Sequence, residues 1–250
     1  MKKIQYILYS LILLSCGSDS SLDCLQNSGT IVQKEYDRDI FKKIMIFERV
    51  ELIVSQGEKQ SIVVETGENL LNEIKVRVED SVLKVSNRNS CNFIRDYGIT
   101  KVYVTSPNIT EIRNSSSINV KSSGAPLQFP KLKLISNDEF FGDEFHNDGG
   151  FELDLDVGAL NIDANGVSRF ILKGKAFNAS FVISDSDVRI EAGELIIQRL
   201  GIAHRGTNIM IVNPQLFIKG EIRSLGDVIS KNRPPVVEVE ELFRGRLIFE

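Results

Sequence analysis

Short runs of alternating apolar and polar residues, separated by Gly, Asn, Asp and Ser, restrict this chain to β structure. In residues 48–57, ERVELIVSQG, the side chains of Val50, Leu52 and Val54 fall on one face of a strand. Residues 74–79 and 101–106 repeat this pattern, whereas residues 68–74, ENLLNEI, predict a single helical turn. We therefore expect an all-β fold whose most regular strands lie toward the N-terminal end.

From about residue 108 the apolar runs shorten, and we expect strands of only three or four residues. Apolar anchors recur there at a wide interval: Ile112 to Leu134 (22), Leu134 to Ile162 (28), Ile162 to Ile183 (21) and Ile197 to Ile218 (21). A repeat near 20 residues is typical of a β-solenoid, which resembles a parallel β-helix and in which each coil buries its apolar stripe against its neighbours. A sandwich or barrel also uses short strands with frequent turns and stays the alternative.

The N-terminal residues have the order of a bacterial lipoprotein signal. Lys2 and Lys3 precede an apolar run over residues 4–14, which is too short to span a bilayer, and Ser15 then precedes Cys16. We predict cleavage before Cys16 and lipidation of that cysteine; the alternative is an ordinary secretory signal with an incidental cysteine. Export would place the protein in the cell envelope, most simply at the outer membrane, on a face that the sequence leaves open.

The two remaining cysteines, Cys24 and Cys91, suit a disulfide because an exported protein meets an oxidising compartment. Such a bond would close a loop of about 67 residues and stabilise the fold by on the order of 4 kcal/mol. Two free thiols, or an unrelated pairing, are the alternatives.

Composition excludes several functional classes. The chain carries 30 Lys and Arg against 34 Asp and Glu, which argues against a nucleic-acid binder. It has only two histidines, His146 and His204, and it lacks a P-loop, a nucleophile elbow and an HExxH pattern. We therefore assign no catalytic residue, no metal ligand and no cofactor.

Residues 136–150, SNDEFFGDEFHNDGG, form the most suggestive polar segment. Its acidic residues and His146 could supply ligands to a hard cation, but their spacing does not fit an EF-hand. A solvated acidic loop is the simpler interpretation. Whether this loop binds a cation stays open.

Asp154, Asp156 and Asp163 alternate with apolar residues in residues 151–166. Two carboxylates about 5 to 10 Å apart across a cleft would suit glycoside hydrolysis. The same pattern arises wherever the solvent-facing side of a strand is acidic, so we keep an envelope polysaccharide-processing enzyme only as an alternative.

The segment from Phe41 to about Ser224 resembles the head GIN domain family, whose members are described as auto-transporter adhesins. The motifs that carry this resemblance are QG (56–57), VVETGENL (63–70), LKV (83–85) and VYVTSPNITEI (102–112). The resemblance implies an exported Bacteroidota protein with a right-handed, solenoid-like β fold, and it carries over no catalytic residue. The glycine-rich repeats usual in the family are sparse here, and NSSSINVKSSG (114–124) is the nearest match.

Together these features predict four segments: a signal peptide (1–15), a lipidated Cys16 with a polar tether (16–29), a head GIN-like β domain (30–229) and a C-terminal strand or cap (230–250). We expect a non-enzymatic envelope lipoprotein, attached to the membrane through its lipid, that presents a β-solenoid face to a glycan or protein partner. Besides the enzyme, a structural or signalling lipoprotein is an alternative.

Overall fold

The fold comes from a computed structural model that describes residues 27–89, 99–138 and 145–250. The predicted lipidation site Cys16 and both predicted disulfide partners, Cys24 and Cys91, lie outside these residues, so both modifications stay predictions. Within the described part of the chain, no helix is long and apolar enough to cross a bilayer.

The chain is all-β, as the alternation predicts. Its N-terminal half forms β1 (Ile31–Glu35), β2 (Lys43–Glu48), β3 (Glu51–Gln56), β4 (Ser61–Gly67), the 3-10 turn η1 (Glu68–Glu73), β5 (Ile74–Glu79), β6 (Val82–Asn87), β7 (Lys101–Ser106), β8 (Glu111–Ser116) and β9 (Val120–Ser122). Its C-terminal half forms β10 (Lys131–Ser136), β11 (Phe151–Ala164), β12 (Arg169–Ile183), β13 (Arg189–His204), β14 (Met210–Val212), β15 (Pro214–Ile222), β16 (Val228–Ser230), β17 (Val236–Glu241) and β18 (Leu247–Phe249).

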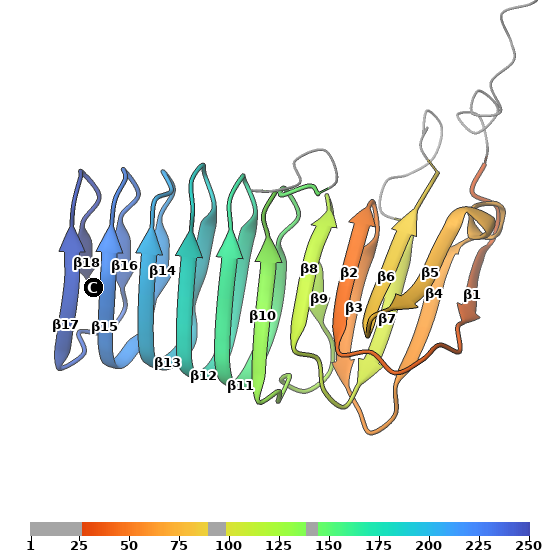
Figure 1. Cartoon of the computed structure of the whole chain (residues 1–250), viewed down its shortest axis with the longest axis horizontal. Coiled ribbons are helices and arrows are strands. Elements are labelled where there is room, and N and C mark those ends of the chain that lie inside the picture. Colours follow the sequence, from red (N-terminus) through yellow and green to blue (C-terminus); the bar gives the residue numbers. More distant parts are fainter. Residues whose placement is uncertain (1–26, 90–98, 139–144) are drawn as a thin grey trace, which may run out of the picture.

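The strands line up along the long axis of the molecule in two facing layers (Figure 1). The front layer runs through β5, β6, β2, β8, β10, the second halves of β11, β12 and β13, then β15 and β17. The rear layer runs through β1, β4, β7, β3, β9, the first halves of β11, β12 and β13, then β14, β16 and β18. We use the names front layer and rear layer for these two sets.

Most neighbouring strands are parallel, but three pairs at the N-terminal end are antiparallel: β1–β4, β4–β7 and β5–β6. The sheet is therefore mixed and curled. The right-handed β-solenoid stays a prediction for the parallel part of the chain.

The strands that cross from one layer to the other are longer than expected. β11, β12 and β13 have 14, 15 and 16 residues, so the prediction of three- or four-residue strands is wrong for them. In β11 the pairing with β12 skips only Gly158, at the bend between the layers. Because a single residue absorbs the bend, each strand continues from the rear layer into the front layer.

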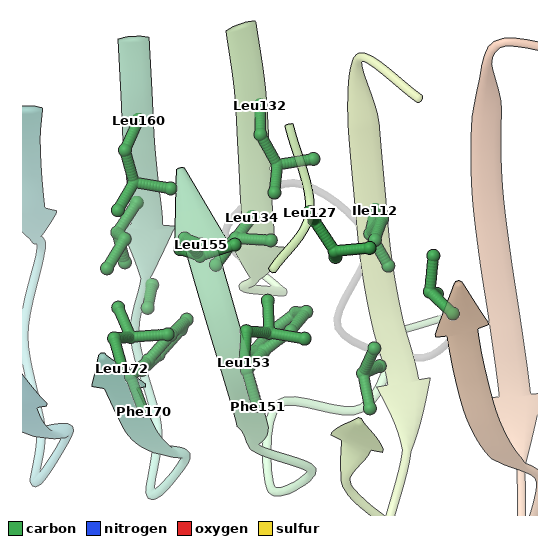
Figure 2. Close-up of a cluster of buried hydrophobic side chains, with 14 of the residues drawn as sticks. Ile112, Leu127, Leu132, Leu134, Phe151, Leu153, Leu155, Leu160, Phe170 and Leu172 are labelled. Atoms are coloured by element: carbon green, nitrogen blue, oxygen red, sulfur yellow. The ribbon is translucent and has the colours of Figure 1, made fainter. Parts of the chain in front are cut away.

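The hydrophobic core fills the space between the layers (Figure 2). Each strand sends alternate residues inward, and the same inward position is occupied in neighbouring strands of the rear layer by Phe151, Phe170, Ile190, Met210 and Val228. The rings of Phe151 and Phe170 stack with centroids 4.9 Å apart. Full burial of each such side chain contributes about 1.5–3 kcal/mol, so contacts between adjacent coils supply much of the stability.

The predicted anchors agree with the observed register at the N-terminal side and fail further on. Leu134 lies opposite Ile112 and also opposite Ile162, as expected. Ile162, however, lies opposite Phe181 rather than Ile183, and Ile218 lies opposite Leu200 rather than Ile197. The apolar alternation repeats every two residues, so the sequence alone does not distinguish the two-residue offset at Ile162. The three-residue offset at Ile218 has another cause, the shorter stretch of chain between Ile211 and Pro214.

Residues 230–250, expected as a terminal strand or cap, contain β17 and β18. These strands extend the front and rear layers by one coil, in parallel with β15 and β16. Val236, Phe243 and Ile248 are 44%, 55% and 42% exposed there. The final coil thus leaves apolar side chains in contact with solvent.

Candidate binding groove

A groove of about 810 Å³ crosses the outer surface of the rear layer, from the end of β9 over β11, β12, β13 and the short strand β14 to Lys231, which follows β16. Leu153 and Leu172 contribute to its floor, and both are almost fully buried in the core below. Ile171, Ile211 and the charged side chains around them form its sides. We call this feature the rear groove.

The rear groove exists because one coil is shorter than the coil before it. On β13, five residues (192–196) separate Glu191, which pairs with Ile211, from Ile197, which pairs with Pro214. On the following coil, two residues (212–213) cover the same stretch. The shorter coil therefore leaves part of β13 without a neighbouring strand on that side.

Side-chain amides hold the short coil in place. Asn213 Nδ2 donates to the carbonyl of Gly193 (3.2 Å), and the backbone N–H of Ile197 donates to the carbonyl of Asn213 (3.1 Å). Asn232 Nδ2 donates to the carbonyl of Pro214 (2.7 Å). We call the part of β13 without a neighbouring strand the notch. The backbone groups next to the notch thus have hydrogen-bond partners, as buried polar groups require.

Gly193 lies where β13 bulges. Its neighbours Glu191 and Glu194 pair with Ile171 and Lys173, so β13 has one residue more than β12 over this stretch. A Cβ at Gly193 would lie 3.2 Å from Ile211 Cγ2 and 3.4 Å from Lys231 Cγ. Glycine therefore lets the next two coils approach the bulge, a common use of glycine at bulges.

Charged groups of both signs surround the rear groove. Lys173 Nζ lies 3.3 Å from Asp154 Oδ2, and Lys231 contacts Glu250. Arg169 and Arg189 donate hydrogen bonds that hold the pKa of the Glu191 carboxyl below its usual range. This surface can hold an extended ligand by apolar contact along its sides and by ion pairing with either charge.

The three aspartates of the enzyme alternative are not brought together. Asp154 and Asp156 face outward from the rear half of β11, whereas Asp163 lies on its front half. Asp163 accepts a hydrogen bond from Asn137 Nδ2 (2.8 Å) and lies 3.2 Å from Lys133 Nζ. The hydrophobic core separates Asp163 from the other two, so only Asp154 and Asp156 share a face.

The acidic loop is described only in part, because residues 139–144 lie outside the described residues. Asp138 Oδ1 accepts a hydrogen bond from Asn165 Nδ2 (2.8 Å), which ties this end of the loop to the end of β11. Among the described residues, no group of three or more His, Cys, Asp or Glu could hold a metal ion.

His146 and Asp148 line a crevice of about 260 Å³ beside Glu48. Glu48 has a backbone φ of 53°, in the left-handed region that residues other than glycine rarely adopt. Burial raises the pKa of its carboxyl, although the backbone N–H of Asn87 donates to it (3.1 Å). No sequence motif marks Glu48, because it lies in an ordinary strand-end pattern.

The residues of the rear groove were also missed. Lys173, Glu194 and Lys231 come from three different coils, and no motif connects them. The available signal was the spacing of the repeat, which shortens after β13. Ile197 and Ile218 suggest an unchanged interval, but the structure pairs Ile218 with Leu200.

The family model described as "Putative auto-transporter adhesin, head GIN domain" matches residues 40–234 of the chain. No curated protein matches the chain. Solved structures with a similar fold include a putative adhesin from Bacteroides fragilis, with 21% identity and a TM-score of 0.76, covering 88% of this chain and 97% of that one.

Two structures from Parabacteroides are also similar. A putative adhesin from Parabacteroides merdae has 19% identity and a TM-score of 0.61, over 89% of this chain and 97% of its own. A putative lipid binding protein from Parabacteroides distasonis has 16% identity and a TM-score of 0.59, over 88% of this chain and 97% of its own. At these identities the likeness concerns the fold alone.

Proposed function

The chain belongs to the head GIN domain family of putative auto-transporter adhesins, and we propose that it is a non-enzymatic binding module of the bacterial cell envelope. The rear groove is the observation that carries this proposal. It offers an apolar centre with charged groups around it, which is the general anatomy of a recognition surface.

We propose a protein segment as the ligand, rather than a glycan. Ile171 and Ile211 offer aliphatic surface that an apolar side chain would cover. Lys173 and Glu194 provide charges of opposite sign on adjacent strands, which would orient a partner that also carries both signs. A neutral glycan would neither cover the aliphatic surface with an apolar side chain nor pair with the two charges.

The same proposal includes the way the module is displayed. Cleavage before Cys16 would leave a lipidated residue one and a polar tether (16–29), followed by the β domain (30–229) as a right-handed β-solenoid and the C-terminal strand or cap (230–250). A Cys24–Cys91 disulfide would fasten the tether to the domain. We propose the outer membrane as the anchoring membrane; the order of residues 1–16 supports the lipid anchor, and the auto-transporter adhesin description of the family supports this membrane.

Two assays on intact cells test the display. Mass spectrometry of the N-terminal peptide should find a lipid on Cys16, and protease shaving of intact cells should show whether the domain faces outward. An unmodified N-terminus that begins before Cys16 would refute the anchor without affecting the binding proposal.

Binding is tested with cell-envelope preparations of the producing bacterium as the probe, divided into untreated, proteinase K-treated and periodate-treated samples. Ile171→Asp and Lys173→Glu should each reduce retention of the protein at least about tenfold, because each removes a central contact of the rear groove. Lys131→Glu, which makes the same charge change on an exposed lysine of the front layer, should bind like the unchanged protein.

The two treatments decide the class of ligand. Loss of retention after proteinase K alone supports a protein partner. Loss after periodate alone contradicts it and favours a glycan. Equal retention of the groove variants and the Lys131→Glu control would show that the rear groove is not the binding site.

A further inference from the structure

The two ends of the front layer are edge strands. β17 pairs with β15, and no other described strand pairs with it. At the opposite end β5 pairs with β6 alone among the described strands. An edge strand presents unpaired backbone donors and acceptors, so each end can accept a further strand.

β17 presents an acidic outer face and an apolar inner face. Glu238 and Glu240 point away from the core, and among the described residues neither makes an ion pair. Val237 continues the inward row that Ile218 occupies one coil earlier, but Val237 is 39% exposed whereas Ile218 is fully buried. Another strand beside β17 would cover this valine.

β5 presents the opposite charge. Lys75 and Arg77 point outward, while Val76 and Val78 point toward the core. Arg38 Nε donates to the carbonyl of Val76 (3.1 Å), so this carbonyl lies at the outer edge of β5 and already has a donor within the chain. A strand that pairs with β5 there must displace the Arg38 side chain. The Arg77–Glu79 contact of 3.4 Å is solvent-exposed, and exposed pairs of this kind contribute little, so Arg77 can exchange partners.

The strand directions make the two edges compatible. β5 is antiparallel to β6, and β6 is parallel to β2 and the rest of the front layer, which includes β17. Two copies stacked in the same direction would therefore bring β17 of one beside β5 of the next as an antiparallel pair. One register matches the four central pairs: Glu238 with Arg77, Glu240 with Lys75, Val237 with Val78, and Val239 with Val76. The end pairs, Val236 with Glu79 and Glu241 with Ile74, are not complementary.

From this match we propose that the chain associates head to tail with a second copy of itself, through β17 of one copy and β5 of the next. A symmetric contact is disfavoured, because β17 against β17 would set glutamates opposite glutamates and β5 against β5 would set cations opposite cations. A head-to-tail contact uses two different surfaces, so it leaves one free edge at each end and can continue into a row.

Charge reversal tests this arrangement in the detergent-solubilised full chain. One variant carries Lys75→Glu and Arg77→Glu, and the other carries Glu238→Lys and Glu240→Lys. Sedimentation velocity over a range of concentrations should show a ladder of oligomers for the unchanged chain. Each variant alone should associate at least about tenfold more weakly, since two attractive cross-strand pairs become repulsive.

An equimolar mixture of the two variants should recover association, because the reversed edges complement each other. Raising the salt to about 0.5 M should weaken association of the unchanged chain, since these charges are exposed. Glu238→Gln with Glu240→Gln removes attraction without adding repulsion and should fall between the unchanged chain and the reversals. Circular dichroism spectra must match throughout, so that loss of association is not loss of folding.

Three results would overturn the proposal. The unchanged chain could remain monomeric at the highest concentration. It could form a single dimer that does not extend. The mixed variants, both folded, could fail to recover association.

Discussion

His204 is the most unusual buried side chain in the described part of the molecule. It is fully buried, its Nε2 lies 3.0 Å from the carbonyl of Asn208, and its Nδ1 has no hydrogen-bond partner among the described residues. Nε2 must therefore carry the proton, since a carbonyl can only accept. Burial lowers the pKa of this imidazole, against smaller opposing effects of the Asn208 carbonyl and the Asp227 charge.

This environment predicts a loss of stability in mild acid. The unfolded chain takes up a proton on His204 near pH 6.5, whereas the folded chain resists it until a lower pH. The contribution of His204 is therefore complete above about pH 6.5 and declines below it, by at most about 1.4 kcal/mol per pH unit for one proton.

Urea unfolding at pH 7.5, 6.0 and 5.0 measures this effect. The His204→Gln variant keeps an N–H that can reach Asn208 and has no titration in this range, so its free energy of unfolding should fall less between pH 7.5 and 5.0. Equal declines in variant and unchanged protein would show that other groups cause the acid sensitivity.

At the scale of elements, the strand ladder between β11 and β12 depends on matching aromatic residues. Phe151 and Phe170 are fully buried and stack on each other between the layers (Figure 2). Interiors are close-packed, so a large side chain removed there leaves a cavity that the coils on either side cannot fill completely.

We expect Phe151→Ala to lower the free energy of unfolding by about 3–5 kcal/mol, as large-to-small changes in a core do. Phe177→Ala is the matched control, because Phe177 is 51% exposed and contacts the Arg199 guanidinium at the surface. It should cost less than about 1 kcal/mol. Similar losses for the two variants in chemical unfolding would contradict the proposed core.

Sequence patterns predict the strands well and their pairing less well. Val50, Leu52 and Val54 are all buried, as their alternation implies, and residues 68–73 form a six-residue 3-10 helix where one helical turn was expected. The pairing of Ile218 was mistaken because the bulge at Gly193 and the short coil at Asn213 change the interval locally. The rear groove follows from those two irregularities, so a search for regular repeats could not find it.

At the scale of the whole molecule, the described part is a row of strands in two layers, in which each strand contacts mainly its neighbours (Figure 1). The proposed Cys24–Cys91 bond would add one long-range constraint between the tether and the N-terminal end of this row. A disulfide stabilises chiefly by restricting the unfolded chain, and a loop of about 67 residues gives on the order of 4 kcal/mol.

The disulfide is tested by three variants. Cys24→Ser, Cys91→Ser and the double variant should each lose about the same free energy of unfolding, because either single change removes the whole bond. A reductant should destabilise the unchanged protein alone. If the unchanged protein is insensitive to the reductant, or if the two single variants differ widely, these cysteines are not paired.

The short coil after β13 has an evolutionary consequence. The shape of the rear groove is encoded in the number of residues between Ile211 and Pro214 more than in their identity. A gain of three residues at Asn213 would close the notch, and a loss of three in another coil would open one elsewhere, while the inward-facing ladder stayed in place. Insertions and deletions, more than point substitutions, would then diversify what such molecules recognise.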